Sequence, residues 1–191
     1  MALILASASP RRRQLLADAG VSFVVETSPV VEAIGHGESP EAYVRRLARE
    51  KAAGVARSHP EDWVLAADTE VVLDGRVLGK PRDSGEAVAM LASLSGRCHG
   101  VMTAFALLGP SGTREGLCRT EVCFRALSGA EIRRYVATGE PMDKAGAYGI
   151  QGGAAHMVES IRGSYTNVVG LPMAETLAVL CDAGVADIFN T

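Results

Sequence analysis

Apolar runs and amphipathic stretches alternate along most of the chain. The run LILAS (3–7) is short and almost wholly apolar, and residues 10–19 behind it place leucine and alanine at helical spacing. The runs VSFVVET (21–27) and WVLAAD (63–68) flank a long amphipathic stretch over 39–58. A continuous apolar run indicates a buried strand, and a period near 3.6 indicates a helix. Alternation of the two is typical of α/β domains.

The second half of the chain continues this alternation with longer strands. Asp74-Gly75 predicts a hairpin after the strand that begins at 63, because this dipeptide suits a tight two-residue turn. The segments CHGVMTAFALLG and LCRTEVCFRAL are partly alternating and flank the turn GPSG, which predicts a strand pair. The remaining predicted elements are a helix over 83–94, a helix capped by Ser128, the glycine-rich loop DKAGAYGIQGGAA, a strand in AHMVESI and a last helix in PMAETLAVLCDAG.

Composition and charge narrow the classes of protein that this pattern allows. The chain has 191 residues, of which 48% are hydrophobic and 21% charged, so one α/β domain over 1–191 can form a core. A net charge of −3 argues against binding to a nucleic-acid polymer. No signal peptide and no apolar run near the ~20 residues of a membrane span are visible. We therefore expect a cytoplasmic protein that does not bind membranes.

Cysteine and histidine spacing gives no sign of a metal centre. The four cysteines form no CxxC pair, and we expect buried or free thiols without a metal or redox role at Cys98, Cys118, Cys123 and Cys181. The four histidines show no metal-ligand spacing, and we expect structural roles for His36, His59, His99 and His156.

Three arginines open the first predicted helix. Ser9 suits the N-cap and Pro10 the first helical position, so Arg11, Arg12 and Arg13 fall in the first turn. The helix dipole disfavours cations there by about 0.3–1 kcal/mol each at the surface, a cost small enough for the arrangement to arise by chance. The alternative is a bound anion, since free N–H groups, hydroxyls and guanidinium forks together form a phosphate site.

Two charged residues lie at positions that the pattern marks as inward facing. Lys51 follows Leu47 by four residues on the apolar stripe of the long helix. It either lies along the edge of that stripe or pairs with a phosphate or carboxylate. Asp68 ends the apolar run WVLAA, where open α/β sheets bind ligands. It either caps the following turn or acts as a metal ligand or general base, with Glu70 as a second oxygen ligand or a solvated acid.

Further candidates lie in predicted loops. GRVLGKP (75–81) is not a P-loop, because three residues separate its glycines and proline follows the lysine. Lys80 is then either a positive charge beside Asp68 or an ordinary surface lysine. Gln151, in the glycine-rich loop, offers a donor and an acceptor to a nucleobase edge. Together with the arginines and the buried acid, and without a GxSxG motif, these residues indicate hydrolysis or transfer at a phosphate without a covalent nucleophile.

Six segments carry a resemblance to a known family: SASPRRRQLL, AREKA, AADTEVVLDGRVLGKP, LSGRCHGVMT, DKAGAYGIQG and GSYTNVVGLP. In this order and at this spacing, the chain resembles the Maf family of nucleoside triphosphate pyrophosphatases. The resemblance implies an α/β fold with a mixed, highly twisted sheet flanked by helices and two lobes around a central cleft. It also implies a homodimer, a divalent cation (Mg²⁺ or Mn²⁺) and cleavage of a nucleoside triphosphate to monophosphate and pyrophosphate. Removal of unwanted nucleotides is the implied role.

The resemblance also implies roles for individual residues. The triphosphate cradle corresponds to Ser7, Arg11 and Arg12. The catalytic cluster corresponds to Glu32, Lys51, Asp68 and Lys80, with Asp68 as the proton acceptor. In this hypothesis the oxygens of Asp68 and Glu32 hold the metal ion.

Three positions favour pyrimidine substrates within the family. Arg11, Thr69 and Gln151 are typical of the dTTP/UTP group, whereas the group acting on 7-methyl-GTP typically carries a bulky aromatic, Gln and Glu there. A glutamine amide pairs with N3–H and O4 of thymine or uracil. We expect dTTP and UTP as substrates, with modified pyrimidines such as 5-methyl-UTP as further ones. His156 departs from the family, which usually has an aromatic there. The alternatives are a 7-methyl-GTP pyrophosphatase and a non-catalytic regulator of cell division or septum formation.

Overall fold

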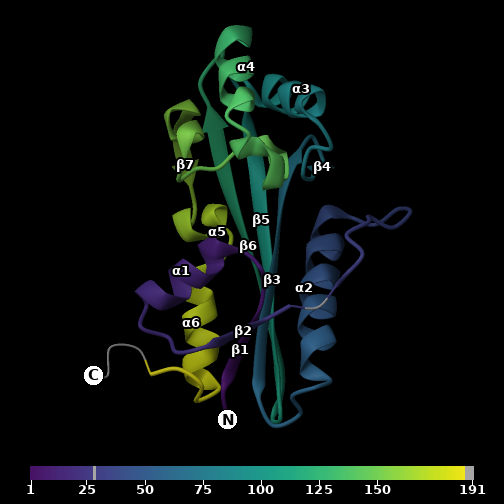
Figure 1. The fold of residues 1–191 in the computed structure, drawn as a ribbon, viewed down its shortest axis with the longest axis vertical. Coiled ribbons are helices and arrows are strands. Elements are labelled where there is room, and N and C mark those ends of the chain that lie inside the picture. Colours follow the sequence, from purple (N-terminus) through teal and green to yellow (C-terminus); the bar gives the residue numbers. More distant parts are fainter. Residues whose placement is uncertain (28, 188–191) are drawn as a thin grey trace. The chain divides into compact units, whose positions relative to one another are not determined.

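The computed structural model describes residues 1–27 and 29–187, so the predicted loop over 28–38 is described from residue 29 onward. Strands and helices alternate as the sequence predicts (Figure 1). The strands are β1 (Leu3–Ala6), β2 (Val24–Glu26), β3 (Trp63–Leu73), β4 (Arg76–Leu78), β5 (Cys98–Gly109), β6 (Gly112–Phe124) and β7 (Val158–Arg162). The helices are α1 (Pro10–Asp18), α2 (Pro40–Ala56), α3 (Ser84–Leu94), α4 (Gly129–Ala137), α5 (Tyr165–Val169) and α6 (Met173–Asp182), with the 3₁₀ turns η1 (Glu140–Asp143), η2 (Ala145–Ala147) and η3 (Gly153–Met157).

The strands form one mixed sheet. Its order is β2-β1-β3-β5-β6-β7, with β4 paired to β3 off this path. β1 runs parallel to both β2 and β3, whereas β4 is antiparallel to β3 and β7 is antiparallel to β6. A mixed sheet flanked by helices confirms the predicted fold class. The chain divides into two compact units, to both of which β3, β5 and β6 contribute residues. The single domain and the central cleft stay predictions.

Unit 1 comprises Met1–Asp68, Thr103–Cys118 and the chain from Gly170 onward. Its core uses alternate residues of β1, β3 and β5 on one face of the sheet, packed against the buried sides of α1 and α6. Figure 1 shows α2 on the other side of these strands. The core residues of unit 1 are Leu3, Leu5, Leu16, Val21, Trp63, Leu65, Ala67, Phe105, Leu107, Leu171, Met173 and Leu180. This core fixes α1, which carries Arg11 and Arg12, and the part of β3 that ends at Asp68.

Unit 2 comprises Thr69–Met102 and Arg119–Val169. Here α3 packs against α4 and against the short turns that follow α4. Three buried rings, those of His99, Phe124 and Tyr148, contact one another edge to face with centroids 4.8 to 5.4 Å apart. The Nε2 atom of His99 lies 2.8 Å from the Tyr148 hydroxyl.

Helix starts and the hairpin follow their sequence signals. Ser9 caps α1 by accepting a hydrogen bond from the Arg12 N–H, and Ser39 caps α2 in the same way. Ser128 and Glu131 form a reciprocal capping box at the start of α4. Asp74 and Gly75 both adopt positive φ, as a tight hairpin turn between β3 and β4 requires. The helix α5 was not predicted, and the predicted strand 21–27 shortens to Val24–Glu26.

The strand predicted over 63–68 and the first strand of the hairpin predicted after it form one continuous strand. β3 continues to Leu73, so Asp68 lies within the strand instead of at its carboxyl end. The extension has a packing reason, because Val71, Val72 and Leu73 are buried and pair with β4. The sequence pattern predicts Asp68 at the end of the strand, because a charged residue usually marks the end of a buried strand. Here the charged residue is itself buried within a longer strand.

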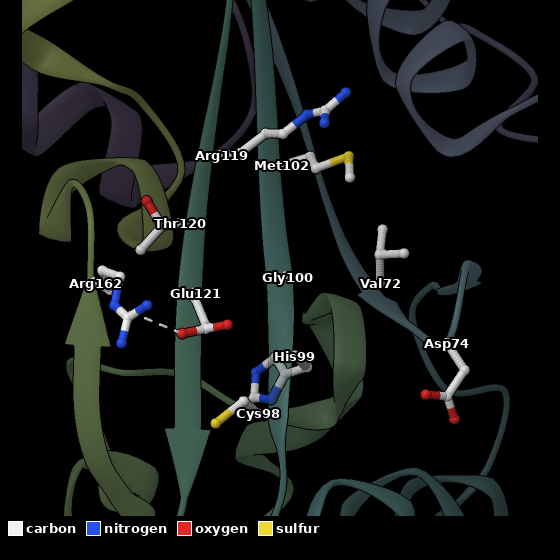
Figure 2. A pocket seen from close by; sticks show the side chains of 10 residues that line it. All are labelled: Val72, Asp74, Cys98, His99, Gly100, Met102, Arg119, Thr120, Glu121 and Arg162. Carbon is white, nitrogen blue, oxygen red and sulfur yellow. Dashed lines mark ion pairs between the residues drawn. The ribbon is translucent and has the colours of Figure 1, made fainter.

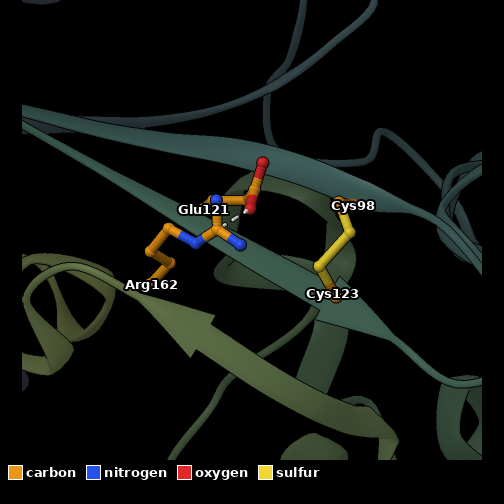
Figure 3. The surroundings of a disulfide bond; sticks show 4 residues. All are labelled: Cys98, Glu121, Cys123 and Arg162. Carbon is orange, nitrogen blue, oxygen red and sulfur yellow. Dashed lines mark ion pairs between the residues drawn. A yellow bond between two sulfur atoms is a disulfide. The ribbon is translucent and has the colours of Figure 1, made fainter.

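The prediction of thiols was wrong for Cys98 and Cys123, which form a disulfide (Figure 3). These residues lie on the neighbouring strands β5 and β6 with Cα atoms 3.9 Å apart. The spacing of 25 residues carries no sign of this proximity, because it arises from strand register. Cys118 and Cys181 are outside any disulfide. No helix in the described part of the chain is long and apolar enough to cross a membrane.

Candidate active site

Three charged side chains meet in unit 1. Lys51 Nζ donates hydrogen bonds to Glu32 Oε1 and to Asp68 Oδ1, each at 2.6 Å. Lys51 lies on the face of α2 that also carries buried Leu47 and Val55. The inward direction predicted for Lys51 is confirmed, and its partners are carboxylates.

Burial makes the Lys51–Asp68 pair the centre of this cluster. The Asp68 side chain is 7% exposed and that of Lys51 16%, whereas that of Glu32 is 38% exposed. The second carboxylate oxygen of Asp68, Oδ2, is buried without a hydrogen-bond partner among the described residues. A buried carboxylate oxygen without a partner is costly. Its presence beside a lysine indicates a site that completes its interactions with water, substrate or metal.

The start of α1 holds the second part of the site. Arg12 Nε donates to the Gly170 carbonyl oxygen at 2.7 Å, and Arg12 Nη1 donates to Ser7 Oγ at 3.3 Å. Ser7 Oγ also accepts the Ser9 N–H at 3.2 Å. These bonds fix the guanidinium and the hydroxyl beside the first turn of the helix. The first turn contains no acidic residue, so its positive charge is available to an anion.

Electrostatics couples the α1 arginines to the acidic cluster. Burial lowers the pKa of Arg12, and the negative charges of Asp68 and Glu32 raise it in part. Arginine nevertheless stays protonated in proteins. The neighbouring positive charge of Arg11 lowers the Arg12 pKa further. Arg12 therefore interacts with two carboxylates and with the neighbouring Arg11, an arrangement suited to a triphosphate.

The other predicted residues lie in unit 2. Thr69 follows Asp68 in β3 and is half-buried, while Lys80 and Gln151 are exposed. The Gly146 N–H donates to the Gly79 carbonyl oxygen at 3.1 Å, which joins the glycine-rich loop to the segment that carries Lys80. The placement of Lys80 beside Asp68 stays a prediction. Glu70 is 8% exposed, so its interpretation as a solvated acid was wrong.

Two residues that the sequence did not single out hold the turn around Gln151. Tyr135 of α4 donates its hydroxyl to Glu140 Oε1 at 2.9 Å and accepts the Gly149 N–H at 3.2 Å. Glu140 Oε2 accepts the Gly153 N–H at 2.9 Å. We call this arrangement of Tyr135 and Glu140 the turn clasp. It bonds the turn on both sides of Gln151.

The turn clasp also explains why glycine stands next to Gln151. A Cβ on Gly152, the residue after Gln151, would lie 2.1 Å from Glu140 Oε1 of the clasp. Burial raises the pKa of Tyr135, so its hydroxyl stays a donor at neutral pH. The only signal in the sequence was the density of glycines, which indicated close backbone approach but not the partner.

Comparison with solved structures places the fold in a known class. A Ham1 protein of Staphylococcus aureus superimposes with a TM-score of 0.51 at 14% identity, covering 96% of this chain and 100% of that one. A HAM1 protein of Coxiella burnetii gives a TM-score of 0.50 at 17% identity, covering 95% and 100%. At this level of identity the likeness shows the fold alone, and the protein has a Ham1-like α/β fold.

Sequence comparison then gives the family. The model of the family described as Maf-like protein matches residues 2–183, and the chain belongs to this family. A dTTP/UTP pyrophosphatase of Myxococcus xanthus is 55% identical over 182 residues, covering 95% of this chain and 92% of the relative. Relatives with the same name from Desulfotalea psychrophila and Shewanella denitrificans are each 53% identical, covering 91% and 94% of this chain and 90% and 95% of theirs. The resemblance expected from the motifs is confirmed.

Proposed function

We propose that this protein is a nucleoside triphosphate pyrophosphatase that hydrolyses dTTP and UTP to the monophosphate and pyrophosphate. The observation that carries the proposal is the buried Lys51–Asp68 pair, in which Asp68 Oδ2 has no hydrogen-bond partner among the described residues. The chain is also about half identical to relatives named dTTP/UTP pyrophosphatase. The anchored Arg12 beside it supplies the complementary charge for a polyphosphate.

In the proposed mechanism Asp68 is the proton acceptor. Lys51 occupies Oδ1 and holds the carboxylate in one orientation. Oδ2 is then the oxygen that takes a proton from the water attacking the α-phosphorus. This division of the two oxygens follows from their unequal hydrogen bonding.

Cationic residues stabilise the charge that develops on the leaving pyrophosphate. Arg12 is pre-oriented by its bonds to Gly170 and Ser7, so little reorganisation accompanies phosphate binding. Arg11 adds a second guanidinium at the start of α1, and Lys80 of unit 2 adds an ammonium. Hydrolysis of the anhydride needs no covalent intermediate with this set of residues.

A divalent cation, Mg²⁺ or Mn²⁺, fits the oxygen donors of this cluster. Glu32 Oε1 and Asp68 Oδ1 both accept from Lys51 Nζ, so two carboxylates converge on one point of the site. Both ions prefer such hard oxygen ligands. Asp68 and Glu32 would hold the ion, which when bound neutralises phosphate charge and polarises the phosphoryl oxygens.

Base selection is assigned to Gln151, with Thr69 and Arg11. The Gln151 amide is exposed at a turn that the clasp holds by its backbone. Such an amide can donate to O4 and accept from N3–H of thymine or uracil. The family resemblance also supports a homodimer, a cytoplasmic location and a role in the removal of unwanted nucleotides. Sedimentation velocity tests the dimer.

The decisive experiment measures pyrophosphate release from dTTP, UTP, 5-methyl-UTP, CTP, GTP and 7-methyl-GTP. Each reaction contains Mg²⁺, Mn²⁺ or a chelator, with the wild-type protein and with Asp68→Asn. We expect metal-dependent release from dTTP and UTP that Asp68→Asn reduces by at least about a hundredfold. Release mainly from 7-methyl-GTP would contradict the base assignment and keep the reaction. No release from any nucleotide would contradict the proposed activity.

A further inference from the structure

The disulfide of unit 2 lies next to a carboxylate on one face of the β5–β6 strand pair (Figure 3). The sulfur atoms of Cys98 and Cys123 and a carboxylate oxygen of Glu121 all lie within 4.8 Å of one another. Glu121 precedes Cys123 by two residues in β6, so both side chains leave the same face of the strand. Strand register thus brings together two sulfurs and an oxygen, although only two of the three are near in sequence.

The face that carries these three residues is accessible. Cys98 and Glu121 are exposed, and Cys123 is half-buried. An open pocket of about 440 Å³ adjoins them, lined among others by Cys98, Gly100, Glu121 and Arg162 (Figure 2). A Cβ on Gly100 would have one neighbour within 4 Å, the Val72 carbonyl oxygen at 3.8 Å. The space above β5 is therefore open, and an incoming ion and an external ligand have room.

The Glu121 carboxylate is weakly engaged. Its ion pair with Arg162 spans 3.8 Å, and the Arg162 side chain is 89% exposed. Figure 2 shows this pair at the edge of the pocket. Exposed pairs of this length contribute little to stability. Glu121 can therefore exchange Arg162 for another cation with little loss.

The donor set matches zinc once the disulfide is reduced. Zinc bonds to thiolate sulfur at about 2.3 Å and to carboxylate oxygen at about 2.0–2.2 Å, so ligand atoms in a tetrahedral site lie roughly 3.5–3.8 Å apart. The three ligand atoms of this cluster lie within 4.8 Å of one another, and cleavage of the S–S bond lets the two sulfurs move apart into the range that zinc requires. Two thiolates favour zinc over Mg²⁺ or Mn²⁺, which prefer oxygen ligands.

We propose that Cys98, Cys123 and Glu121 form a zinc site in the reduced protein, with a fourth position open to solvent, and that the disulfide is its metal-free, oxidised form. A thioredoxin-class dithiol reduces the bond: it supplies two electrons and two protons, becomes a disulfide, and leaves two thiols on this protein. Zinc then displaces the two thiol protons and binds both thiolates. The site involves no residue of the proposed active site.

Cobalt reports such a site directly, because a thiolate bound to Co²⁺ gives an intense charge-transfer absorption that oxygen ligands do not give. The full-length protein is reduced with a phosphine, which is removed before titration with Co²⁺ and then with Zn²⁺. We expect one equivalent of Co²⁺ to produce the absorption and one equivalent of Zn²⁺ to abolish it. Oxidation with a disulfide-forming reagent should prevent binding, and renewed reduction should restore it.

Matched variants separate this site from other cysteines and from the proposed active site. Cys98→Ser and Cys123→Ser should each lose the absorption, while Cys181→Ser, an exposed cysteine outside the cluster, should retain it. Glu121→Gln should weaken Co²⁺ binding by at least about tenfold. Circular dichroism confirms that each variant is folded. Three results would each overturn the proposal. The reduced wild type could show no absorption, Cys98→Ser could show an undiminished absorption, or the Co²⁺ titration could saturate at one metal ion per two chains.

Discussion

Lys51 and Asp68 form an ion pair with an Nζ–Oδ1 distance of 2.6 Å, and both side chains are largely buried. Removing one partner of such a pair leaves an uncompensated charge, which typically costs about 3–5 kcal/mol. We expect Lys51→Met to lower the free energy of unfolding by about 2–4 kcal/mol, because Lys51 keeps some solvent contact. Urea unfolding measures the change.

The double variant Lys51→Met/Asp68→Asn supplies the control for this prediction. Removing both charges removes the unpaired carboxylate, so we expect it to recover more than half of the stability lost in Lys51→Met. Additive losses would show that the two residues act independently. The exposed pair Arg82–Glu86 offers a comparison, since Arg82→Met should change the free energy of unfolding by less than about 1 kcal/mol.

The bonds of Arg12 predict an effect on substrate affinity that charge alone does not give. Arg12→Lys keeps a cation but cannot reproduce the bonds to both Gly170 and Ser7 in one orientation. We expect KM for dTTP to rise by about tenfold or more, as for loss of a charged hydrogen bond. Arg13→Lys, at an exposed position of the same turn, should leave KM within about twofold. Equal effects at the two positions would contradict the specific role of Arg12.

The turn clasp predicts a loss of base selection without loss of the reaction. Tyr135→Phe removes the hydroxyl that joins Glu140 to the Gly149 N–H. We expect faster hydrogen exchange at Gly149 and Gly153, a higher KM for dTTP and a smaller preference for dTTP over 7-methyl-GTP. We expect kcat to change by less than about threefold, because the clasp does not contact the reacting atoms. The exposed Tyr165→Phe is the matched control. Unchanged exchange in Tyr135→Phe would contradict the clasp itself.

Local signals in the sequence predicted the elements and the direction of Lys51. The Ser-Pro pairs at Ser9 and Ser39 identify helix starts because an N-cap and a fixed φ act within one turn. The Asp74-Gly75 hairpin and the 3.6 period that turns Lys51 inward are equally local. Each of these features depends on residues fewer than five apart, so each could be read without the fold.

Features that depend on packing between distant segments could not be predicted in this way. A buried aspartate within a strand is unusual, and the hydrogen bond from Lys51, a residue of a distant helix, offsets part of the cost of burying Asp68. The Cys98–Cys123 bond depends on the register of β5 and β6. The role of Glu140 depends on a turn whose glycines lie up to thirteen residues away.

His99 predicts a pH dependence of stability in the acidic range. Burial lowers the pKa of His99 to about 4 from an ordinary value of 6.5. Between these pH values the unfolded chain binds a proton at His99 and the folded protein does not, so the free energy of unfolding falls as the pH decreases from 6.5 to 4. At 1.36 kcal/mol per unit, His99 accounts for a loss of about 3 kcal/mol over this interval.

A variant at this position isolates the contribution of His99 from those of the carboxyl groups. Arg46 and Arg125 hold the pKa values of Glu38 and Glu131 at about 2, so these two acids lose their stabilising effect mainly below pH 4.5. His99→Gln keeps a polar group for Tyr148 but does not titrate. Between pH 6.5 and 4 we expect the free energy of unfolding to fall less in this variant than in the wild type, by about 3 kcal/mol. Urea unfolding at several pH values measures the difference. The exposed His36→Gln should retain the wild-type slope, and a wild-type slope in His99→Gln would exclude His99 as the titrating group.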